Sequence, residues 1–186
     1  MYRRESKLFF VTPLTEFLFL IKKFMIQKGG NNFAFIDSQN VYQGTKELGW
    51  RLDWHRFRIY LREKYEVSRA YLFLGYIPKN EKMYKWLENA DFVLCFKKVT
   101  NVHGEIKGNV DVNLTLKAIL EKDNYDQAIL VTSDGDFYPL VEYLTSINKL
   151  YTILSPCETT CSKLLKESAK KRIYFMQRLK DKIGQK

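Results

Sequence analysis

The stretch AILVTSDGDFYPL, Ala128–Leu140, decides the fold. Its first four residues, Ala128–Val131, are apolar without interruption, which is typical of a strand buried on both faces of a sheet. Asp134 and Asp136 follow directly, on either side of Gly135, and an aromatic and apolar helical pattern comes next. Two carboxylates this close repel each other unless they bind a cation or point apart into water.

The same alternation of buried strands and helices runs through the rest of the chain. Strands are predicted at Phe33–Asp37, Val67–Tyr76, Asp91–Val99, Gln127–Thr132 and Leu150–Ser155. Helices are predicted at Leu52–Tyr65, Pro78–Ala90, Val110–Asp123 and Phe137–Ile147, and Thr100–Asn109 is predicted to be a loop. Continuously apolar strands that alternate with helices indicate a parallel sheet covered on both faces. We therefore expect an α/β fold, a three-layer α/β/α sandwich with a central, mostly parallel sheet.

The length of 186 residues suits one domain with a full core. We expect this domain at residues 31–156, preceded by an N-terminal extension at 1–30. Residues 157–186 are expected to form a basic helix, starting near Thr159, that packs on the domain or extends it.

In the helix predicted at Val110–Asp123, the apolar side consists of Val112, Leu114 or Thr115, Leu116, Ile119 and Leu120.

Composition favours a folded, cytoplasmic protein with a polyanionic partner. The chain is 46% hydrophobic, with only 9 Gly and 4 Pro, which excludes disorder as the dominant state. Its formal net charge of +10 favours nucleic acid or an anionic membrane surface, with plain solubility as the alternative. The odd count of 3 Cys indicates free thiols and a reducing, cytoplasmic setting rather than a disulfide framework.

The apolar segment LFFVTPLTEFLFLI, Leu8–Ile21, follows several basic residues, as a signal peptide would. It is too short to span a bilayer, contains Pro13 and Glu16, and has no small-residue cleavage site, so we expect no stable membrane insertion. Three interpretations remain: an amphipathic helix docked on the domain, a peripheral membrane anchor, or sequence upstream of a natural start at Met25. The docked helix is preferred.

Acidic residues are predicted to converge at one edge of the sheet. Asp37 ends the first strand, Asp134 and Asp136 follow the fourth, and Asp111 lies in the first turn of the preceding helix. Ligands of parallel sheets gather at the carboxyl ends of the strands, so these carboxylates and nearby Asn40 are expected to meet there. Each aspartate alone has a structural explanation as a turn, cap or helix-dipole residue. Together, oxygen-only ligands favour Mg²⁺ or Mn²⁺.

Three segments resemble the signature segments of the NYN domain, in its LabA-like branch within the PIN-like nuclease superfamily. They are FAFIDSQNVY, KGNVDVNLTLKAI and AILVTSDGDFYPLVEYL, in the expected order, and they span the core from about Asn32 to Ser155. The resemblance implies an α/β/α sandwich and a metal-dependent ribonuclease. On it, Asp37, Asp111, Asp134 and Asp136 match the acidic positions that hold Mg or Mn, and Asn40 matches a further catalytic position.

Two departures from the family pattern concern this site. Many relatives carry an additional acidic residue in the middle helix where this chain has Lys117, and the usual S-G-D is here Thr132, Ser133, Asp134. Lys117 would weaken a second metal site or bind substrate phosphate instead.

RNA, with single strands favoured, is the expected partner, and the resemblance also allows a homodimer. The substrate-binding residues predicted from the sequence are Ser133, Lys107, Lys117, Tyr42 and Trp50. The two aromatic residues, in the loop expected after the first strand, are predicted to stack on bases. The alternatives are a PIN-like domain that binds RNA or protein without catalysis, favoured by Lys117, and a phosphatase of small phosphoesters, which would not need the high positive charge.

Overall fold

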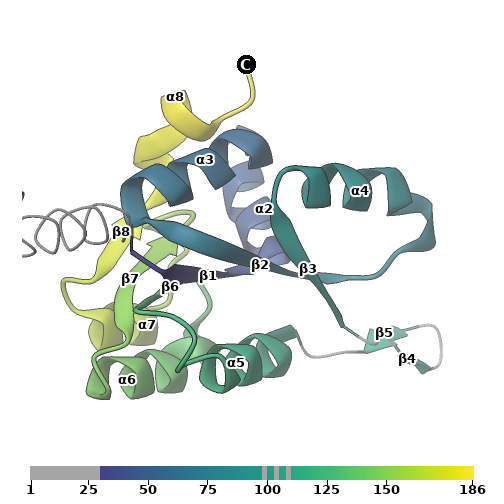
Figure 1. Cartoon of the computed structure of the whole chain (residues 1–186). Helices are drawn as coiled ribbons and strands as arrows, with labels where there is room; N and C mark the ends of the chain where they lie inside the picture. The colour runs from purple at the N-terminus through teal and green to yellow at the C-terminus, as the bar shows by residue number, and fades with distance from the viewer. Residues whose placement is uncertain (1–29, 98–99, 103–104, 108–109) are drawn as a thin grey trace, which may run out of the picture.

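The computed structural model describes residues 30–97, 100–102, 105–107 and 110–186 (Figure 1). Six strands form one parallel sheet in the order β3-β2-β1-β6-β7-β8. The strands are β1 (Asn32–Asp37), β2 (Val67–Gly75), β3 (Phe92–Lys97), β6 (Ala128–Val131), β7 (Leu150–Ser155) and β8 (Ile173–Phe175). The predicted parallel sheet is confirmed. The predicted N-terminal extension, apart from Gly30, lies outside the described residues.

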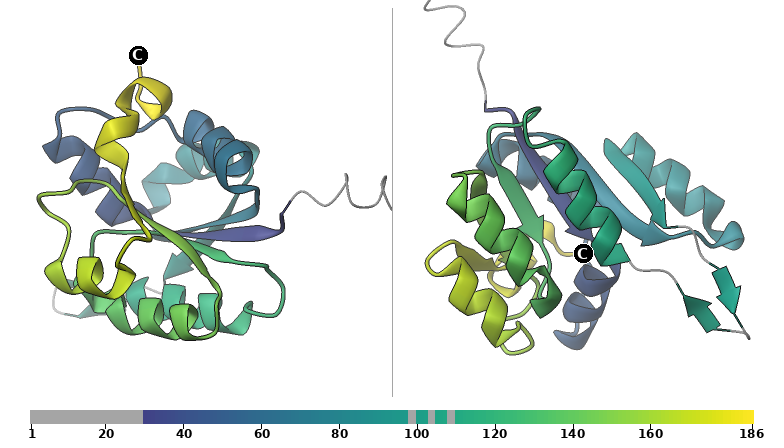
Figure 2. Two further views of the ribbon diagram at one scale, coloured as in Figure 1. Left: turned by 90° about the vertical axis from the view of Figure 1, so that its left-hand side faces the viewer. Right: turned by 90° about the horizontal axis from the view of Figure 1, so that it is seen from below.

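Helices cover both faces of the sheet (Figures 1 and 2). One face carries α2 (Ser38–Glu47), α3 (Trp54–Tyr65), α4 (Glu81–Asn89) and α8 (Lys180–Ile183). The opposite face carries α5 (Val110–Leu120), α6 (Tyr138–Ser146) and α7 (Lys163–Ala169). The predicted three-layer α/β/α sandwich is therefore confirmed. Within the described part of the chain, every helix is too short or too polar to cross a lipid bilayer.

Alternating side chains of the central strand β1 contribute to two apolar cores, one on each face of the sheet. In β1, Ala34 and Ile36 join the core beneath α3 and α4, whereas Phe33 and Phe35 join the core against α5 and α6. Successive residues of a strand point to opposite faces, so one short run of apolar residues serves both layers. This burial on both faces explains why the strands are continuously apolar.

The helix α2 occupies the segment that the sequence was expected to leave as a loop. The carboxylate of Asp37 caps it, accepting hydrogen bonds from the backbone N–H groups of Gln39 and Asn40 at 3.1 Å each. Gly49 follows the helix with a φ of 73°, a left-handed conformation that glycine adopts without strain. The N-terminal cap Asp37 and the glycine after the helix, Gly49, are both visible in the sequence. The helix was missed because α2 carries too few apolar residues to show a helical pattern.

Two further predictions, both for the chain that connects β3 to β6, are wrong. Residues in the predicted loop form a small antiparallel hairpin, β4 (Thr100–Val102) paired with β5 (Glu105–Lys107). The helix α5 buries Leu114 and Ala118, whereas three of the residues predicted on its apolar side are exposed: Val112, Leu116 and Leu120. The apolar residues of α5 lie on more than one side of the helix, so the pattern alone did not show which side faces the sheet.

The single basic helix predicted for residues 157–186 is also wrong. The chain forms α7, the edge strand β8, a 3₁₀ helix η3 (Met176–Leu179) and then α8. At the end of α7, Lys170 has a φ of 54°, which reverses the chain. The strand β8 then pairs with β7 in parallel and covers hydrogen-bonding groups that an edge strand would expose. The segment is thus part of the sheet rather than a helix added to it.

Candidate active site

Carboxylates of three residues meet beyond the end of β6. Asp111 lies in the first turn of α5, Asp134 follows β6, and Asp136 lies in the 3₁₀ helix η2 (Gly135–Phe137). One carboxylate oxygen from each residue lies within 4.8 Å of those of the other two. We call Asp111, Asp134 and Asp136 the acidic cluster. Segments far apart in the sequence bring these three predicted residues together.

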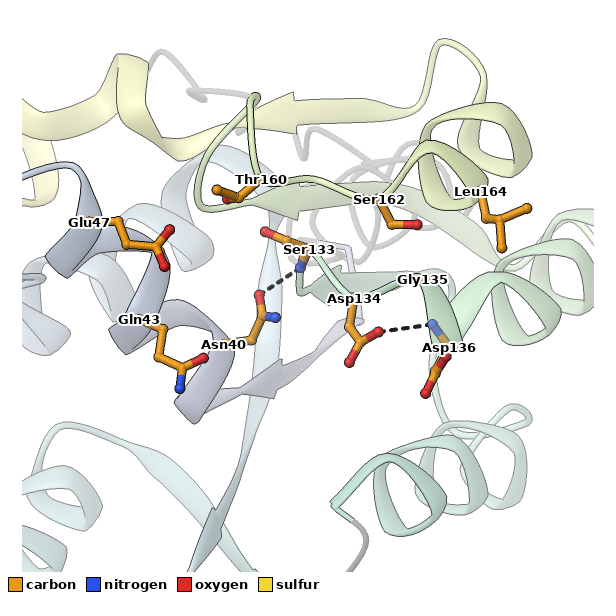
Figure 3. Close-up of a pocket in the computed structure, with 11 residues that line it drawn as sticks. Asn40, Gln43, Glu47, Ser133, Asp134, Gly135, Asp136, Thr160, Ser162 and Leu164 are labelled. Atoms are coloured by element: carbon orange, nitrogen blue, oxygen red, sulfur yellow. Dashed lines mark hydrogen bonds between the residues drawn. The ribbon is translucent and has the colours of Figure 1, made fainter.

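The backbone around Asp134 is held by hydrogen bonds that begin where β6 ends. The Thr132 hydroxyl accepts a hydrogen bond from the Asp134 N–H at 3.1 Å, and the Asp134 carboxylate accepts one from the Asp136 N–H at 3.0 Å (Figure 3). A side chain at Gly135 would collide with the Ser162 hydroxyl, so only glycine allows the loop before α7 to approach this closely. The direction of the Asp134 side chain is therefore set by a buried strand and a tight turn.

Asp37 lies beside the acidic cluster but is not among the three residues within 4.8 Å of each other. It is buried at the end of β1, where it caps α2. Burial raises the pKa of its carboxyl, and the negative charges of Asp111 and Asp134 raise it further, while hydrogen bonds from Asn40 and Gln39 oppose the shift. Its predicted role as a metal ligand stays a prediction.

Asp111 experiences the same repulsion. Burial raises the pKa of its carboxyl, the charges of Asp134 and Asp136 add to the shift, and Lys97 opposes it. Like charges packed together raise each other's pKa, and a bound cation would relieve this cost. The electrostatics of the acidic cluster thus favour a positive ligand.

Replacing Asp37 by asparagine is expected to raise the thermal midpoint at neutral pH in buffer with EDTA. Asparagine still caps α2 but removes a carboxylate whose ionised form is disfavoured by burial. A raised pKa in the folded state means that the carboxyl's contribution to stability is complete below its ordinary value of 3.8. That contribution is lost as the pH rises through the raised value. Thermal melts between about pH 4 and about pH 7 measure this difference. A variant that melts below wild type at neutral pH contradicts it.

Asn40 and Ser133 lie together, and hydrogen bonds fix the positions of both. The Asn40 side-chain oxygen accepts a hydrogen bond from the Ser133 N–H at 2.7 Å, which ties α2 to the loop after β6 (Figure 3). The Ser133 hydroxyl bonds to the buried Ser155 hydroxyl at 2.9 Å. In this arrangement the Ser133 hydroxyl faces the core although the residue lines the cavity, and its predicted substrate contact stays a prediction. The Asn40 amide nitrogen is turned away from Ser133.

A cavity of about 510 Å³ opens beside Asp134 and Asp136. Sequence reasoning identified Asn40, Ser133 and the two aspartates but missed other polar lining residues: Gln43, Glu47, Thr160 and Ser162. The first two lie on α2, three and seven residues after Asn40, which places all three on one helix face. Recognising Asp37 as a helix cap would have predicted this face. The residues from the loop before α7 had no signal in the sequence.

The remaining predicted substrate-binding residues lie in different surroundings. Lys117 pairs with Glu121 at 2.8 Å and lies 4.9 Å from the centre of the Tyr71 ring. Six residues along a helix change direction by about 240°, so Lys117 does not share the face of Asp111. Trp50 is largely buried but lines a cavity beside Tyr42, and its predicted stacking on bases stays a prediction. Tyr42 lies on α2 and is 56% exposed. Lys107 ends β5, and its role stays a prediction.

Comparison with known proteins identifies relatives of this arrangement. The family model described as NYN domain matches residues 33–177. Low amplitude and bright protein LabA of Synechococcus elongatus is 25% identical over 132 residues, which cover 65% of this chain and 71% of that protein. A crystal structure of a Vibrio parahaemolyticus protein of unknown function has a TM-score of 0.70 at 26% identity, covering 86% of this chain and 99% of that one.

Proposed function

Because this chain belongs to the NYN domain family, we propose that it is a metal-dependent ribonuclease that hydrolyses phosphodiester bonds at the acidic cluster. The observation that carries the proposal is the meeting of three carboxylates within 4.8 Å, beside a polar cavity. They lie beyond a strand end of a parallel sheet, where ligands of such folds bind. The net charge of +10 over the whole chain suits a polyanionic substrate.

The donor atoms of the acidic cluster fit Mg²⁺ or Mn²⁺. All are carboxylate oxygens, the ligands that these hard cations prefer, and neither histidine nor cysteine belongs to the group. Asp111, Asp134 and Asp136 would hold the ion, with Asp37 as the adjacent fourth carboxylate. A bound divalent cation would supply an activated water and neutralise charge on the phosphate.

The residues around the cavity would position the substrate. The side chains of Asn40, Gln43 and Ser162 line it with neutral hydrogen-bonding groups, which suit phosphate and ribose oxygens. Asn40 is held in place through its bond to the Ser133 backbone, so its amide nitrogen can donate toward the cavity. Glu47 lines the same cavity on the side of α2 and would keep phosphates near the acidic cluster by repulsion.

From the cavity, a single strand would pass over the outer side of α2 to reach Tyr42, which lies about 200° around the helix from Asn40. Tyr42 lies two residues after Asn40, and the Lys46 ammonium is 5.9 Å from the centre of its ring. A second cavity of about 530 Å³ adjoins Tyr42 and is lined by the exposed side chains of Met83 and Trp86. Exposed aromatic rings beside cations are the features that bind unpaired bases. We therefore favour single-stranded RNA over duplexes.

Tyr42→Ala is expected to weaken binding of a short single-stranded RNA by about 5- to 150-fold, because stacking on one ring contributes about 1–3 kcal/mol. Tyr174→Ala is the matched control, since Tyr174 is 58% exposed but lies on β8. Fluorescence anisotropy with a labelled oligonucleotide in Mg²⁺-free buffer measures both affinities. Equal affinities for Tyr42→Ala and wild type would show that RNA does not stack on Tyr42 of α2.

A nuclease assay tests the proposed function directly. The protein is incubated with single-stranded RNA, single-stranded DNA and duplex RNA, each with Mn²⁺, Mg²⁺ or EDTA. Cleavage of single-stranded RNA that requires either metal and stops with EDTA is expected. Binding of RNA without cleavage under every metal condition would instead support a non-catalytic binding domain.

Lys117 is the feature that favours the non-catalytic alternative, because relatives are expected to have an acid there. Its ammonium pairs with Glu121, away from the face of α5 that carries Asp111. The acidic cluster is therefore complete without this position, and we retain catalysis with one metal ion as the minimal requirement.

The cysteines Cys95, Cys157 and Cys161 are unpaired, in keeping with a proposed cytoplasmic setting.

A further inference from the structure

On the face of the sheet that carries α5, α6 and α7, one part lacks a covering helix among the described residues. The strand β3 is an edge strand, and Val93 and Cys95 pair in register with Tyr71 and Phe73 of β2, which face α5. Partner residues in adjacent parallel strands point the same way, so Val93 and Cys95 also face this side. In Figure 2 (right), β3 is visible beside α5 with no described helix in front of it.

The adjacent side of α5 is apolar and exposed. Val112 and Leu116 are each 51% exposed, and Leu120 is 76% exposed. These residues recur every fourth position and form one stripe along the helix. A cavity of about 720 Å³ lies between this stripe and β3. Phe73, Cys95 and Phe96 line it, and the polar side chains at its border are Lys97, Asn113 and Lys117. We call Val93, Cys95, Val112, Leu116 and Leu120 the apolar face. A contiguous exposed surface of this kind usually binds a partner.

We propose that the apolar face is the docking site of residues 8–21 of the same chain, LFFVTPLTEFLFLI. The start of the described chain supports this choice. The Asn31 N–H donates to the Asp126 carboxylate at 2.9 Å, and the Asn31 amide donates to the Asn124 carbonyl at 2.7 Å. Both acceptors lie in the loop that follows α5. The N-terminal segment therefore attaches next to the Leu120 end of the exposed stripe.

The length of the connection suffices. Residues 22–29 can span up to about 26–29 Å when extended, at about 3.3–3.6 Å per residue. From Leu120 to Val112 the stripe extends only about 12 Å, at 1.5 Å per residue. A segment tethered this closely has an effective concentration near the millimolar range, which favours it over a free partner.

The chemistry of the two surfaces also matches. Residues 8–21 contain one charged side chain, Glu16, and a helix there would place Leu14, Phe17, Leu18 and Ile21 on one side. The connection is basic, with Lys22, Lys23 and Lys28. The segment after α5 contains three acids: Glu121 and Asp123, which pair with Lys117 and Lys122, and Asp126. Apolar docking and attraction between these segments would act together.

The reactivity of the Cys95 thiol in the full-length protein tests the docking. Cys95 lies in the apolar face and is partly exposed in the described structure, whereas Cys157 and Cys161 are buried. Iodoacetamide labelling located by peptide mass spectrometry gives the rate at Cys95. Phe17→Asp is expected to raise this rate about ten-fold or more, because burial of a phenylalanine contributes about 1.5–3 kcal/mol. Leu116→Asp, on the receiving surface, is expected to raise it similarly.

Phe19→Asp is the matched control. It makes the same chemical change on the opposite side of the helix and is expected to leave the rate within about two-fold of wild type. Circular dichroism confirms that each variant is folded. Equal rates in wild type and Phe17→Asp, or equal acceleration by both phenylalanine variants, would overturn the proposal. Protection of Cys95 that disappears on dilution, together with a dimeric mass, would assign the face to a second copy instead. The test does not depend on nuclease activity.

Discussion

Asp134→Asn is expected to lose nuclease activity by about 100- to 1,000-fold, because a metal ion contributes several kcal/mol to stabilising charge in the transition state. Asp134 lies between the other two members of the acidic cluster in the chain. Its backbone N–H donates to the Thr132 hydroxyl, and its carboxylate accepts a hydrogen bond from the Asp136 N–H. Asparagine keeps the size of the side chain and one oxygen but removes the charge that attracts the cation. Initial rates of RNA cleavage with Mn²⁺ measure the loss.

Thermal melts separate loss of the metal from loss of the fold. A ligand that binds only the folded state stabilises it by about 2.7 kcal/mol at a hundred-fold excess over Kd. Wild type is expected to gain this stability with Mn²⁺, whereas Asp134→Asn gains little and melts no earlier than wild type in EDTA. Asp123→Asn makes the same change at an exposed residue paired with Lys122 and should behave as wild type. An equal response of wild type and Asp134→Asn to Mn²⁺ would refute the metal site.

Arg58→Ala is expected to lower the free energy of unfolding by about 3 kcal/mol, because it leaves buried carbonyl groups without a donor. Arg58 lies on α3 and is buried. Its guanidinium donates to the carbonyls of Asp91, Val67 and Ser68 at 3.0–3.2 Å, and to the Asp91 carboxylate at 2.5 Å. These bonds tie α3 to β2 and to the turn before β3. Urea denaturation followed by circular dichroism measures the change.

Arg56→Ala is the control on the same helix. Arg56 forms an ion pair with Asp53 at 3.7 Å, and both side chains are about one-third exposed. Ion pairs in water contribute about 0.2–1 kcal/mol, so this variant should lose little stability. If both arginine variants unfold at the same urea concentration, the buried hydrogen bonds of Arg58 do not hold the layers together.

The sequence by itself determined the fold class and the place of the site. Uninterrupted apolar runs such as Ala128–Val131 are typical of strands buried on both faces, and their alternation with helices indicates a parallel sheet. Carboxylates that directly follow such strands must then lie at one edge. This local reasoning placed Asp134, Asp136 and Asp111 together because strand direction and helix start are both readable from neighbouring residues.

Tertiary packing decided which side chains face the site, since that depends on segments far apart in the sequence. The Ser133 hydroxyl turns inward because Ser155 of β7 offers a buried partner. Ser162 reaches the cavity because Gly135 leaves room for its loop. Lys117 is held by Glu121 and Tyr71, and Trp50 is buried in the core. The strand β8 forms because the edge of β7 offers it hydrogen bonds that no local pattern in residues 157–186 reveals. Contacts of this kind form between surfaces that exist only once the sheet is assembled.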